Sequence, residues 1–216
     1  MRLPQHDITL LPDHSLLIEK EKRHLVLADV HLGKSATFRA EGLAVPEGDS
    51  KKDLDRIAAL ADRYSPDQII IAGDLFHAAT GLTPDLFELV SDFVGSLAIS
   101  VVLVKGNHDQ KIKHLPDFLP QPDYLDIGSI RIIHKPEEAS PDHFNICGHI
   151  HPIVKIPDGK RTHLRMPCFH LRENTLTIPS FGSFTGGQIV RPAPADRFFV
   201  THQSAVIELP DAIFQK

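Results

Sequence analysis

The sequence contains little cysteine and few large aromatic side chains. Its 216 residues include two cysteines, two tyrosines and no tryptophan. Two cysteines, Cys147 and Cys168, cannot supply the disulfide framework that holds many small secreted domains together. We expect both to be buried thiols, because free cysteine behaves as a small apolar residue. A disulfide-stapled extracellular scaffold is therefore excluded as a class.

The sequence also lacks a long apolar run and an excess of positive charge. Near the N-terminus, MRLPQHDITLLPDHSLLIEKEKR holds no apolar stretch long enough for a signal peptide or a membrane span, so we expect no membrane contact and a cytoplasmic location. The net charge is −5. General nucleic-acid coats are basic, so any contact with nucleic acid must be local. Length and a 42% hydrophobic share predict one domain over residues 1–216.

Histidine is abundant, with 14 residues in the chain. It is the commonest metal-ligating side chain, but composition alone assigns no function to it. The positions of the histidines relative to the predicted secondary structure must decide what they do.

Short apolar runs rich in valine and isoleucine predict buried strands. Ser50, with Asp53 three residues on, predicts the start of a helix, and Thr83-Pro84 predicts another. Strands and helices therefore alternate in the first half, which predicts an α/β fold built from βαβ units. The predicted strands cover 8–11, 15–19, 24–30, 68–74, 99–106, 129–134 and 144–150.

The second half differs, because short strands follow one another there without a long helix. Residues 163–187 predict a hairpin that turns at Arg172-Glu173-Asn174 and leads into a glycine-rich loop.

Five of the predicted strands run into aspartate, asparagine or histidine. Ligands of open α/β sheets bind at the carboxyl ends of the strands. Polar groups gathered there without partners would be costly, and a shared cation would remove that cost. The residues are Asp29 and His31, Asp74 and His77, Asn107 with His108 and Asp109, His134, and His149 with His151.

Each motif has a simpler interpretation when taken alone. Asp29 with His31 is typical of a turn with a surface histidine, and Gly106-Asn107 is typical of a β-turn. His134 alone would be a core or edge histidine. What favours a metal site is that all five motifs follow apolar runs.

The donor types narrow the choice of metal. Three oxygen donors occur with four imidazoles and no thiolate, which suits Mn, Fe or Zn and disfavours Ca or a cysteine-rich zinc site. Seven ligands exceed one tetrahedral shell. Two divalent metal ions bridged by one carboxylate fit better, and we expect Mn first.

The order of these motifs resembles that of the calcineurin-like binuclear metallophosphoesterase superfamily. Residues 27–48 and 166–187 further resemble the ligase-associated DNA-damage-response endonucleases of the PdeM type, and GDLFH at 73–77 is similar to the SbcD-type DNA repair nucleases. The resemblance implies a four-layer α-β-β-α sandwich. The matching motifs are Asp29-Val-His31, Gly73-Asp74, Gly106-Asn107-His108-Asp109, His134 and Gly148-His149-Ile-His151.

The resemblance also implies a role for each residue. His108 would protonate the leaving oxygen or stabilise its charge. For His77 we expect a second catalytic group beside His108, and two alternatives stay open: a partner that orients a metal ligand, or a packed histidine that opens the following loop. Phosphomonoesterases of the superfamily usually carry aspartate at the place of His77. The implied metal ligands are Asp29, His31 and His151 for one ion, Asn107, His134 and His149 for the other, and Asp74 for both.

The sequence departs from the superfamily pattern at two places. Lys135 follows His134 where glycine is common, so His143 and His114 stay open as less favoured substitutes for that ligand. With histidine at position 77, the group that orients His108 is open too. Asp109 or a backbone carbonyl could serve.

The expected activity is metal-dependent phosphodiester hydrolysis, with single-stranded DNA cut internally during DNA repair. Two cations would hold a bridging hydroxide that attacks phosphorus in line. Lys34, Arg39 and Lys111 follow the metal motifs and would bind flanking phosphates, although each alone could be ordinary surface. Phe181 and Phe184 favour core packing over base stacking.

Two alternatives remain open at this stage. One is a nucleotide or cyclic-nucleotide phosphodiesterase, or a phosphatase, of the same superfamily. The other is a catalytically silent scaffold for repair proteins. By the same resemblance, a DNA-repair ligase, helicase or exonuclease would be a partner.

Overall fold

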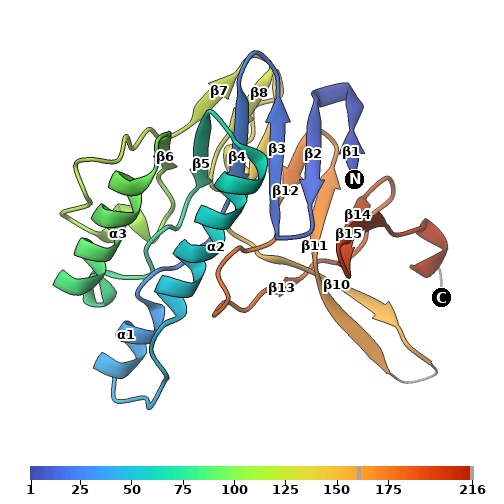
Figure 1. The fold of residues 1–216 in the computed structure, drawn as a ribbon. Helices are drawn as coiled ribbons and strands as arrows, with labels where there is room; N and C mark the ends of the chain where they lie inside the picture. The colour runs from blue at the N-terminus through green and yellow to red at the C-terminus, as the bar shows by residue number, and fades with distance from the viewer. Residues whose placement is uncertain (160–161, 215–216) are drawn as a thin grey trace.

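The computed structural model describes residues 1–159 and 162–214, and its first sheet has six strands (Figure 1). Strands β1 to β4 form an antiparallel meander, whereas β4, β5 and β6 are parallel. All five strands predicted in this half are present. The sheet order is β1 (Arg2–Leu3), β2 (Ile8–Leu11), β3 (Ser15–Glu19), β4 (Arg23–Leu27), β5 (Gln68–Ala72) and β6 (Ser100–Val104).

Of the three α-helices in the described residues, two cover the outer face of this sheet (Figure 1). Helix α2 (Asp49–Tyr64) leads into β5 and helix α3 (Pro84–Ser96) leads into β6, which confirms the predicted βαβ connections. Helix α1 (Lys34–Ala40) was not predicted, because seven residues are too few to show a helical repeat. Short 3-10 turns are η1 (Pro4–His6), η2 (Ala79–Gly81), η3 (Asp109–Lys111), η4 (Pro136–Glu138) and η5 (Asp211–Ile213).

The two predicted helix starts had different outcomes. The Thr83 side chain accepts the N–H of Leu86 at 3.3 Å and caps α3 as expected. The expected cap on α2 was wrong. Helix α2 begins after Gly48 without a side-chain cap, and Ser50 Oγ accepts the N–H of Gly33 at 2.9 Å instead. The Ser50 hydroxyl, which the local sequence predicted to cap α2, is thus used by a backbone N–H from outside the helix.

The second sheet has nine strands, both parallel and antiparallel. The predicted hairpin turn is present, because Arg172 of β11 lies opposite Thr175 of β12 and Glu173 adopts a positive φ of 53°. Strand β10 was missed, since prolines stand at both of its ends. The strands are β7 (Leu125–Ile127), β8 (Ile130–Ile132), β9 (Phe144–Cys147), β10 (Pro152–Pro157), β11 (His163–Arg172), β12 (Thr175–Thr177), β13 (Gln188–Ile189), β14 (Arg197–His202) and β15 (Ala205–Glu208).

The two sheets pack face to face over one apolar core. Val26, Ile70 and Val104 of the first sheet meet Ile146 and Phe169 of the second, all of them buried. Burial of such side chains contributes about 1.5–3 kcal/mol each. The mixed α/β class is confirmed. Helices lie on one side, however. On the far face of the second sheet the described chain places the 3-10 turn η5, not an α-helix.

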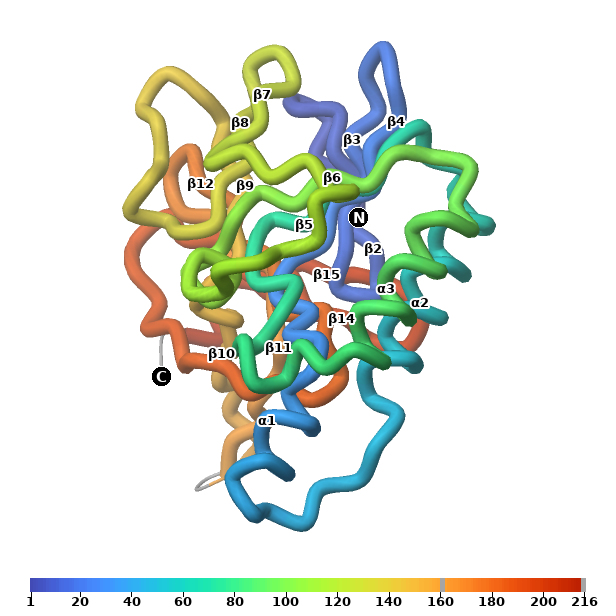
Figure 2. The backbone as a smooth tube through the Cα atoms, turned by 90° about the vertical axis from the view of Figure 1, so that its left-hand side faces the viewer, coloured from blue at the N-terminus to red at the C-terminus, as the bar shows by residue number. Residues whose placement is uncertain are grey.

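Two arms project at the end of the molecule where the metal motifs lie (Figure 2). Helix α1 begins three residues after His31, and the β10–β11 hairpin begins directly after His151. The β3–β4 turn lies at the opposite end in both views. The two arms therefore flank the predicted site.

Both cysteines are buried and unpaired, as expected. Burial raises the pKa of the Cys147 and Cys168 thiols to about 12. Within the described ranges, no helix is long and apolar enough to cross a membrane.

Candidate metal centre

An unusual backbone conformation aims the candidate ligands into one space. Left-handed φ values are uncommon for residues other than glycine and are concentrated at functional sites. Here they occur directly after strands β4, β5 and β9, so the chain turns sharply as it leaves each strand. Five of the candidate ligands have such values, with φ between 46° and 74°: Asp29, His31, Asp74, His149 and His151.

Asp29, His31 and His151 form a first group whose ligand atoms all lie within 4.8 Å of one another. His151 Nε2 lies 3.2 Å from Asp29 Oδ1 and 3.3 Å from His31 Nε2. His151 Nδ1 donates to the carbonyl of Gly186 at 3.1 Å. That hydrogen bond fixes the ring with Nε2 facing the group, as is usual for metal-binding histidines.

Asp74, His134 and His149 form a second group within the same 4.8 Å limit. His134 Nε2 lies 3.3 Å from Asp74 Oδ2 and 3.0 Å from Asn107 Oδ1. His134 Nδ1 donates to the carbonyl of Ala72 at 3.0 Å, so this ring is oriented in the same way.

The two open substitutes for His134 lie elsewhere. His143 Nδ1 contacts Ser140 Oγ at 3.0 Å, and His114 is exposed beside Lys113. His134, in spite of the following Lys135, is the histidine that the structure brings to Asp74.

Backbone hydrogen bonds join the motifs of the two groups. The N–H of His31 donates to the carbonyl of Asp74, and the N–H of Asp29 donates to the carbonyl of Gly73, both at 3.0 Å. Asp74 Oδ1 also accepts the N–H of His108 at 2.9 Å. Asp74 thus lies where β4, β5 and β6 come together.

The protonation states suit a cation. Burial lowers the pKa of His31 to about 3, which leaves its imidazole neutral. Burial alone would raise the pKa of Asp74 and lower that of His134. The contact between the two side chains outweighs burial, so the pKa of Asp74 is held at about 2 and the pKa of His134 at about 9. A proton is therefore held between ligands, where a bound cation would displace it.

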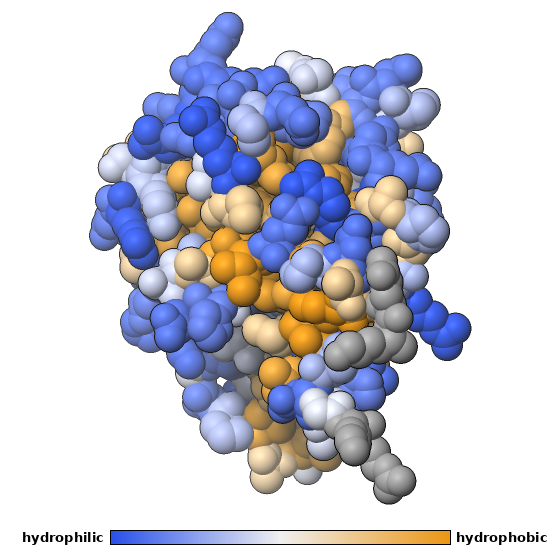
Figure 3. Space-filling model, turned by 90° about the vertical axis from the view of Figure 1, so that its right-hand side faces the viewer, coloured by the Kyte–Doolittle hydropathy of each residue, from blue (hydrophilic) through white to orange (hydrophobic). Residues whose placement is uncertain are grey.

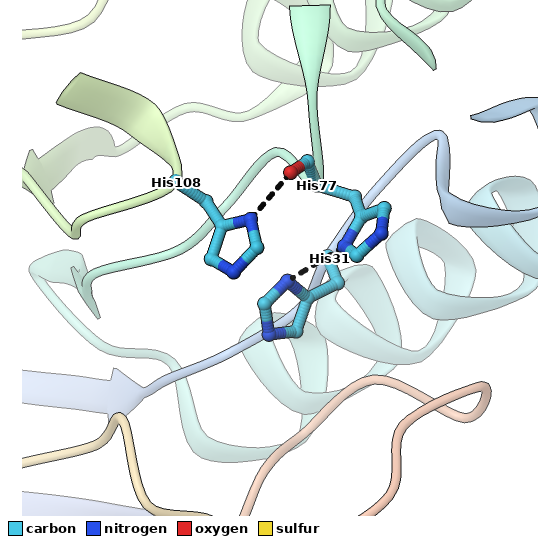
Figure 4. A group of neighbouring side chains, drawn as sticks. All are labelled: His31, His77 and His108. Carbon is cyan, nitrogen blue, oxygen red and sulfur yellow. Dashed lines mark hydrogen bonds between the residues drawn. The ribbon is translucent and has the colours of Figure 1, made fainter. Parts of the chain in front are cut away.

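His31, His77 and His108 form a third group (Figure 4). The rings of His77 and His108 are stacked, with centroids 5.1 Å apart and planes 20° apart. His108 Nδ1 donates to the backbone carbonyl of His77 at 2.6 Å. Of the two candidates for orienting His108, the carbonyl is the one in contact.

Asp109 has a different position from the one considered for it. It is fully buried, and its carboxylate accepts the N–H groups of Asp74 at 2.8 Å, Gly106 at 2.9 Å and Phe76 at 3.0 Å. Burial raises its pKa to about 6. It therefore ties the loop after β5 to the loop after β6. Sequence reasoning missed this role, since nothing local to GNHD shows that the acid turns inward.

The glycines in the motifs have a steric reason. A Cβ on Gly106 would collide with the carboxylate of Asp74, and a Cβ on Gly148 would collide with that of Asp29. Each glycine lets a ligand from a neighbouring strand approach the backbone closely.

The predicted substrate-binding residues have three different surroundings. Lys34 is half-buried near His77, with Nζ 5.9 Å from the Phe38 ring centroid and 5.7 Å from that of Phe184. Arg39 is not brought to the site. Its guanidinium contacts Glu47 at 3.0 Å and the carbonyls of residues 45 and 46. Lys111 is exposed at the end of η3.

The two phenylalanines of the glycine-rich loop, Phe181 and Phe184, differ in burial. Phe181 is 1% exposed and belongs to the core, as expected. Phe184 is 39% exposed and packs edge-on against Phe38, with ring centroids 5.7 Å apart. Phe184 is thus at the surface beside Lys34.

Comparisons with known proteins agree with this geometry. The family model of the calcineurin-like phosphoesterases matches residues 22–172. The structure is similar to that of the nuclease MPE of Pseudomonas putida, with 29% identity, a TM-score of 0.76, and 93% of this chain and 94% of that chain covered. A weaker likeness is to YfcE, a phosphoesterase from E. coli, with 16% identity, a TM-score of 0.44, and 86% and 97% covered. No curated protein matches the sequence.

Proposed function

The chain belongs to the calcineurin-like phosphoesterase family, and we propose that it is a phosphodiesterase that cuts single-stranded DNA internally. Membership makes it a phosphoesterase that uses divalent metals. The likeness to a nuclease over 93% of the chain supports a nucleic-acid substrate.

The donor groups fit two divalent ions, and we propose Mn first. Carboxylate, amide and imidazole donors with no thiolate suit Mn, with Fe and Zn as alternatives. When bound, the ions would polarise the phosphate and activate water. The proposed holders are Asp29, His31 and His151 for one ion, Asn107, His134 and His149 for the other, and Asp74 for both.

His77 and His108 are the reason for proposing a phosphodiester substrate over a phosphomonoester. A diester has one negative charge and an alkoxide leaving group that needs a proton. Nδ1 of His108 is engaged by the His77 carbonyl, which leaves Nε2, 3.9 Å from Asp74 Oδ2, as the atom that would act on that oxygen. The His77 ring is stacked alongside. Burial, with a smaller contribution from Lys34, lowers the pKa of His77 to about 4, so His77 is neutral at pH 7. It therefore acts as a hydrogen-bonding partner or proton relay.

The basic residues around the metal centre, here called the rim (Lys34, Arg39 and Lys111), were expected to bind the DNA backbone, and Lys34 and Lys111 remain candidates for this role. We propose that Lys34, which lies beside the rings of Phe38 and Phe184 and near His77, binds a phosphate beside the scissile one. Lys111 is exposed on the turn that follows His108 and is a second, more peripheral contact.

An activity panel tests the proposal. Metal-free protein is supplied with Mn²⁺ and assayed on circular single-stranded DNA, a bis-aryl phosphodiester and an aryl phosphomonoester. We expect the circle to be opened and the diester to be preferred. A tenfold preference for the monoester would instead indicate a phosphatase. Uncut circles with hydrolysed linear DNA would indicate an exonuclease, and hydrolysis of nucleotide diesters alone a nucleotide phosphodiesterase. Bound metal without turnover would indicate a scaffold.

We also propose a cytoplasmic role in DNA repair, with a repair ligase, helicase or exonuclease as partner. The buried, unpaired thiols of Cys147 and Cys168 fit a reducing compartment. Affinity purification of the tagged chain from its own cells, followed by mass spectrometry, tests the partners. Recovery of none of the three classes would contradict the partner proposal.

A further inference from the structure

The β10–β11 hairpin has two unlike faces. Alternate residues of a strand point to opposite faces. One face carries Val154, Ile156 and Met166, which pack with Phe198 and Val200 in an apolar cluster. Figure 3 shows apolar side chains gathered on this side of the molecule. The hairpin is thus anchored to the body by one face only.

The other face starts at the metal centre and then turns basic. Ile153 and Pro167 lie opposite each other and, together with His151, line a cavity of about 400 Å³. Two residues further out on the same face, about 7 Å along the strands, Lys155 lies directly opposite Arg165. The cavity wall and the basic pair therefore form one continuous surface.

Lys155 and Arg165 form an unfavourable pair in the isolated protein. Like charges directly opposite in an antiparallel pair are destabilising. Both side chains are exposed, and neither has an ion pair with any residue that the structure describes. An anion that bridges the two would relieve the repulsion.

The charged side chains that line the cavity beside the metal centre are basic as well. Lys52 and Arg56 of α2 also line it, and none of the described lining residues is acidic. Arg56 is ion-paired with the buried Asp53 at 2.8 Å, whereas Lys52 has no ion pair with a described residue. By sequence, residues 152–167 contain four lysines and arginines against one aspartate, a net charge of +3 in a chain of net charge −5. Positive charge is therefore concentrated beside the site.

We propose that this surface, the basic track formed by Lys52, Arg56, Lys155 and Arg165, binds the nucleic-acid strand that flanks the scissile phosphate on the His151 side. The inference rests on the proposed function and deepens it, because a mononucleotide or cyclic nucleotide would not reach Lys155. The substrate is then a polymer of several nucleotides, bound by its backbone phosphates independently of base sequence.

The test compares two double variants of the full chain. Lys155→Gln/Arg165→Gln removes the pair on the track. Lys20→Gln/Lys22→Gln removes the same charge from the β3–β4 turn at the opposite end of the molecule, where both lysines are exposed. Affinity for a fluorescent single-stranded oligonucleotide is measured by anisotropy at salt concentrations from about 50 to about 200 mM, a range over which phosphate contacts change the affinity strongly. Cleavage of the same oligonucleotide is compared with hydrolysis of the aryl diester.

We expect the track variant to bind the oligonucleotide roughly tenfold more weakly, with a salt dependence shallower by about 1.4 in log–log slope, since each phosphate contact on a single strand contributes about 0.7. The ratio of oligonucleotide to aryl-diester hydrolysis should fall similarly. The thermal midpoint should stay unchanged or rise, because the repulsion is removed. The Lys20/Lys22 variant should match the wild type in affinity, salt slope, hydrolysis ratio and thermal midpoint.

Failure of the track and failure of the proposed function give different results. If the wild type hydrolyses the diester but the track variant keeps wild-type affinity and salt slope, the track is refuted and the phosphodiesterase stands. If the wild type with Mn²⁺ hydrolyses no diester, the function fails, and the binding curves still decide on the track. Equal losses in both double variants would show a general charge effect and overturn the track.

Discussion

The metal centre and its rim are built by different physics. The candidate ligands follow strand ends, are mostly buried, and have their orientation fixed by backbone contacts such as that of His134 with Ala72. The rim residues lie on a short helix and on loops. Of them, Lys34 is near His77, whereas Arg39 is held by its own loop. The positions of ligands follow from the sheet, but those of rim residues depend on the helix and loop around each one.

This difference predicts how strongly each region responds to substitution. When a buried ligand is removed, several groups lose their hydrogen-bond partner. Substitutions there should therefore have large effects and should lower the metal content. Rim residues have few partners, so changes there should be small and should affect affinity for the polymer. Five variants, ordered from the largest expected effect to the smallest, and one matched control test this contrast.

Asp74→Ala should abolish activity, by roughly a thousandfold or more, together with metal binding. The carboxylate contacts His134 and accepts the N–H of His108, and we propose that it is shared by both ions. Metal content by mass spectrometry and turnover on a DNA diester are measured on the same sample. Retention of two ions per chain would refute the assignment of Asp74 as the bridge.

His77→Ala should lower diesterase turnover by roughly a hundredfold, in the range of a general acid–base group, while both metals stay bound. The ring is stacked on His108 and is not among the proposed ligands. The same two measurements apply. Full activity would mean that only the backbone carbonyl of His77 matters. Loss of a metal would mean that the His31–His77–His108 group holds an ion.

Asp109→Asn should weaken metal affinity by roughly tenfold or more, as is typical when a group that orients ligands is lost. The amide has one acceptor oxygen where the carboxylate accepts three N–H groups around Asp74. The free energy of unfolding should fall by about 2 kcal/mol. Metal titration and chemical denaturation measure the two effects.

Asp196→Asn is the matched control for Asp109. Asp196 is also a buried carboxylate, but it binds Arg172 and the N–H of Ala193 away from the ligands. This control should lose stability and keep metal affinity. Equal losses of metal affinity in both variants would show that Asp109 acts through general stability alone.

The sequence predicts the ligand edge better than it predicts the rim. Strands β4 and β5 follow from apolar runs, and the residues after them lie together because their carboxyl ends are neighbours in one sheet. Strand β9 was also predicted, but it belongs to the second sheet, so its histidines reach the site through the packing of the two sheets. The buried role of Asp109 could not be predicted, since it depends on N–H groups in another loop. Neither could α1, a helix of seven residues, nor β10, which prolines flank.

Lys34→Gln should raise the KM for single-stranded DNA by roughly three- to tenfold and leave metal content intact. Its ammonium lies 5.9 Å from the Phe38 ring centroid and 5.7 Å from that of Phe184, and its charge helps to lower the pKa of His77. KM and kcat are measured separately at two salt concentrations. An effect on kcat alone, with the same salt dependence as the wild type, would contradict a phosphate contact and favour an action through His77.

Arg39→Gln should have the smallest effect, a change in KM of less than about twofold, although its sequence position favoured phosphate binding as strongly as that of Lys34. The guanidinium is engaged by Glu47 and by the carbonyls of residues 45 and 46, and an exposed ion pair of this kind contributes less than about 1 kcal/mol. What should change is the loop 41–48, which Arg39 holds against α1, so cleavage there by a protease should become faster. If Arg39→Gln raised KM as much as Lys34→Gln, the arginine would have to leave its loop to bind DNA. The rim would then be one adaptable surface, and the contrast between fixed ligands and individually placed rim residues would no longer hold.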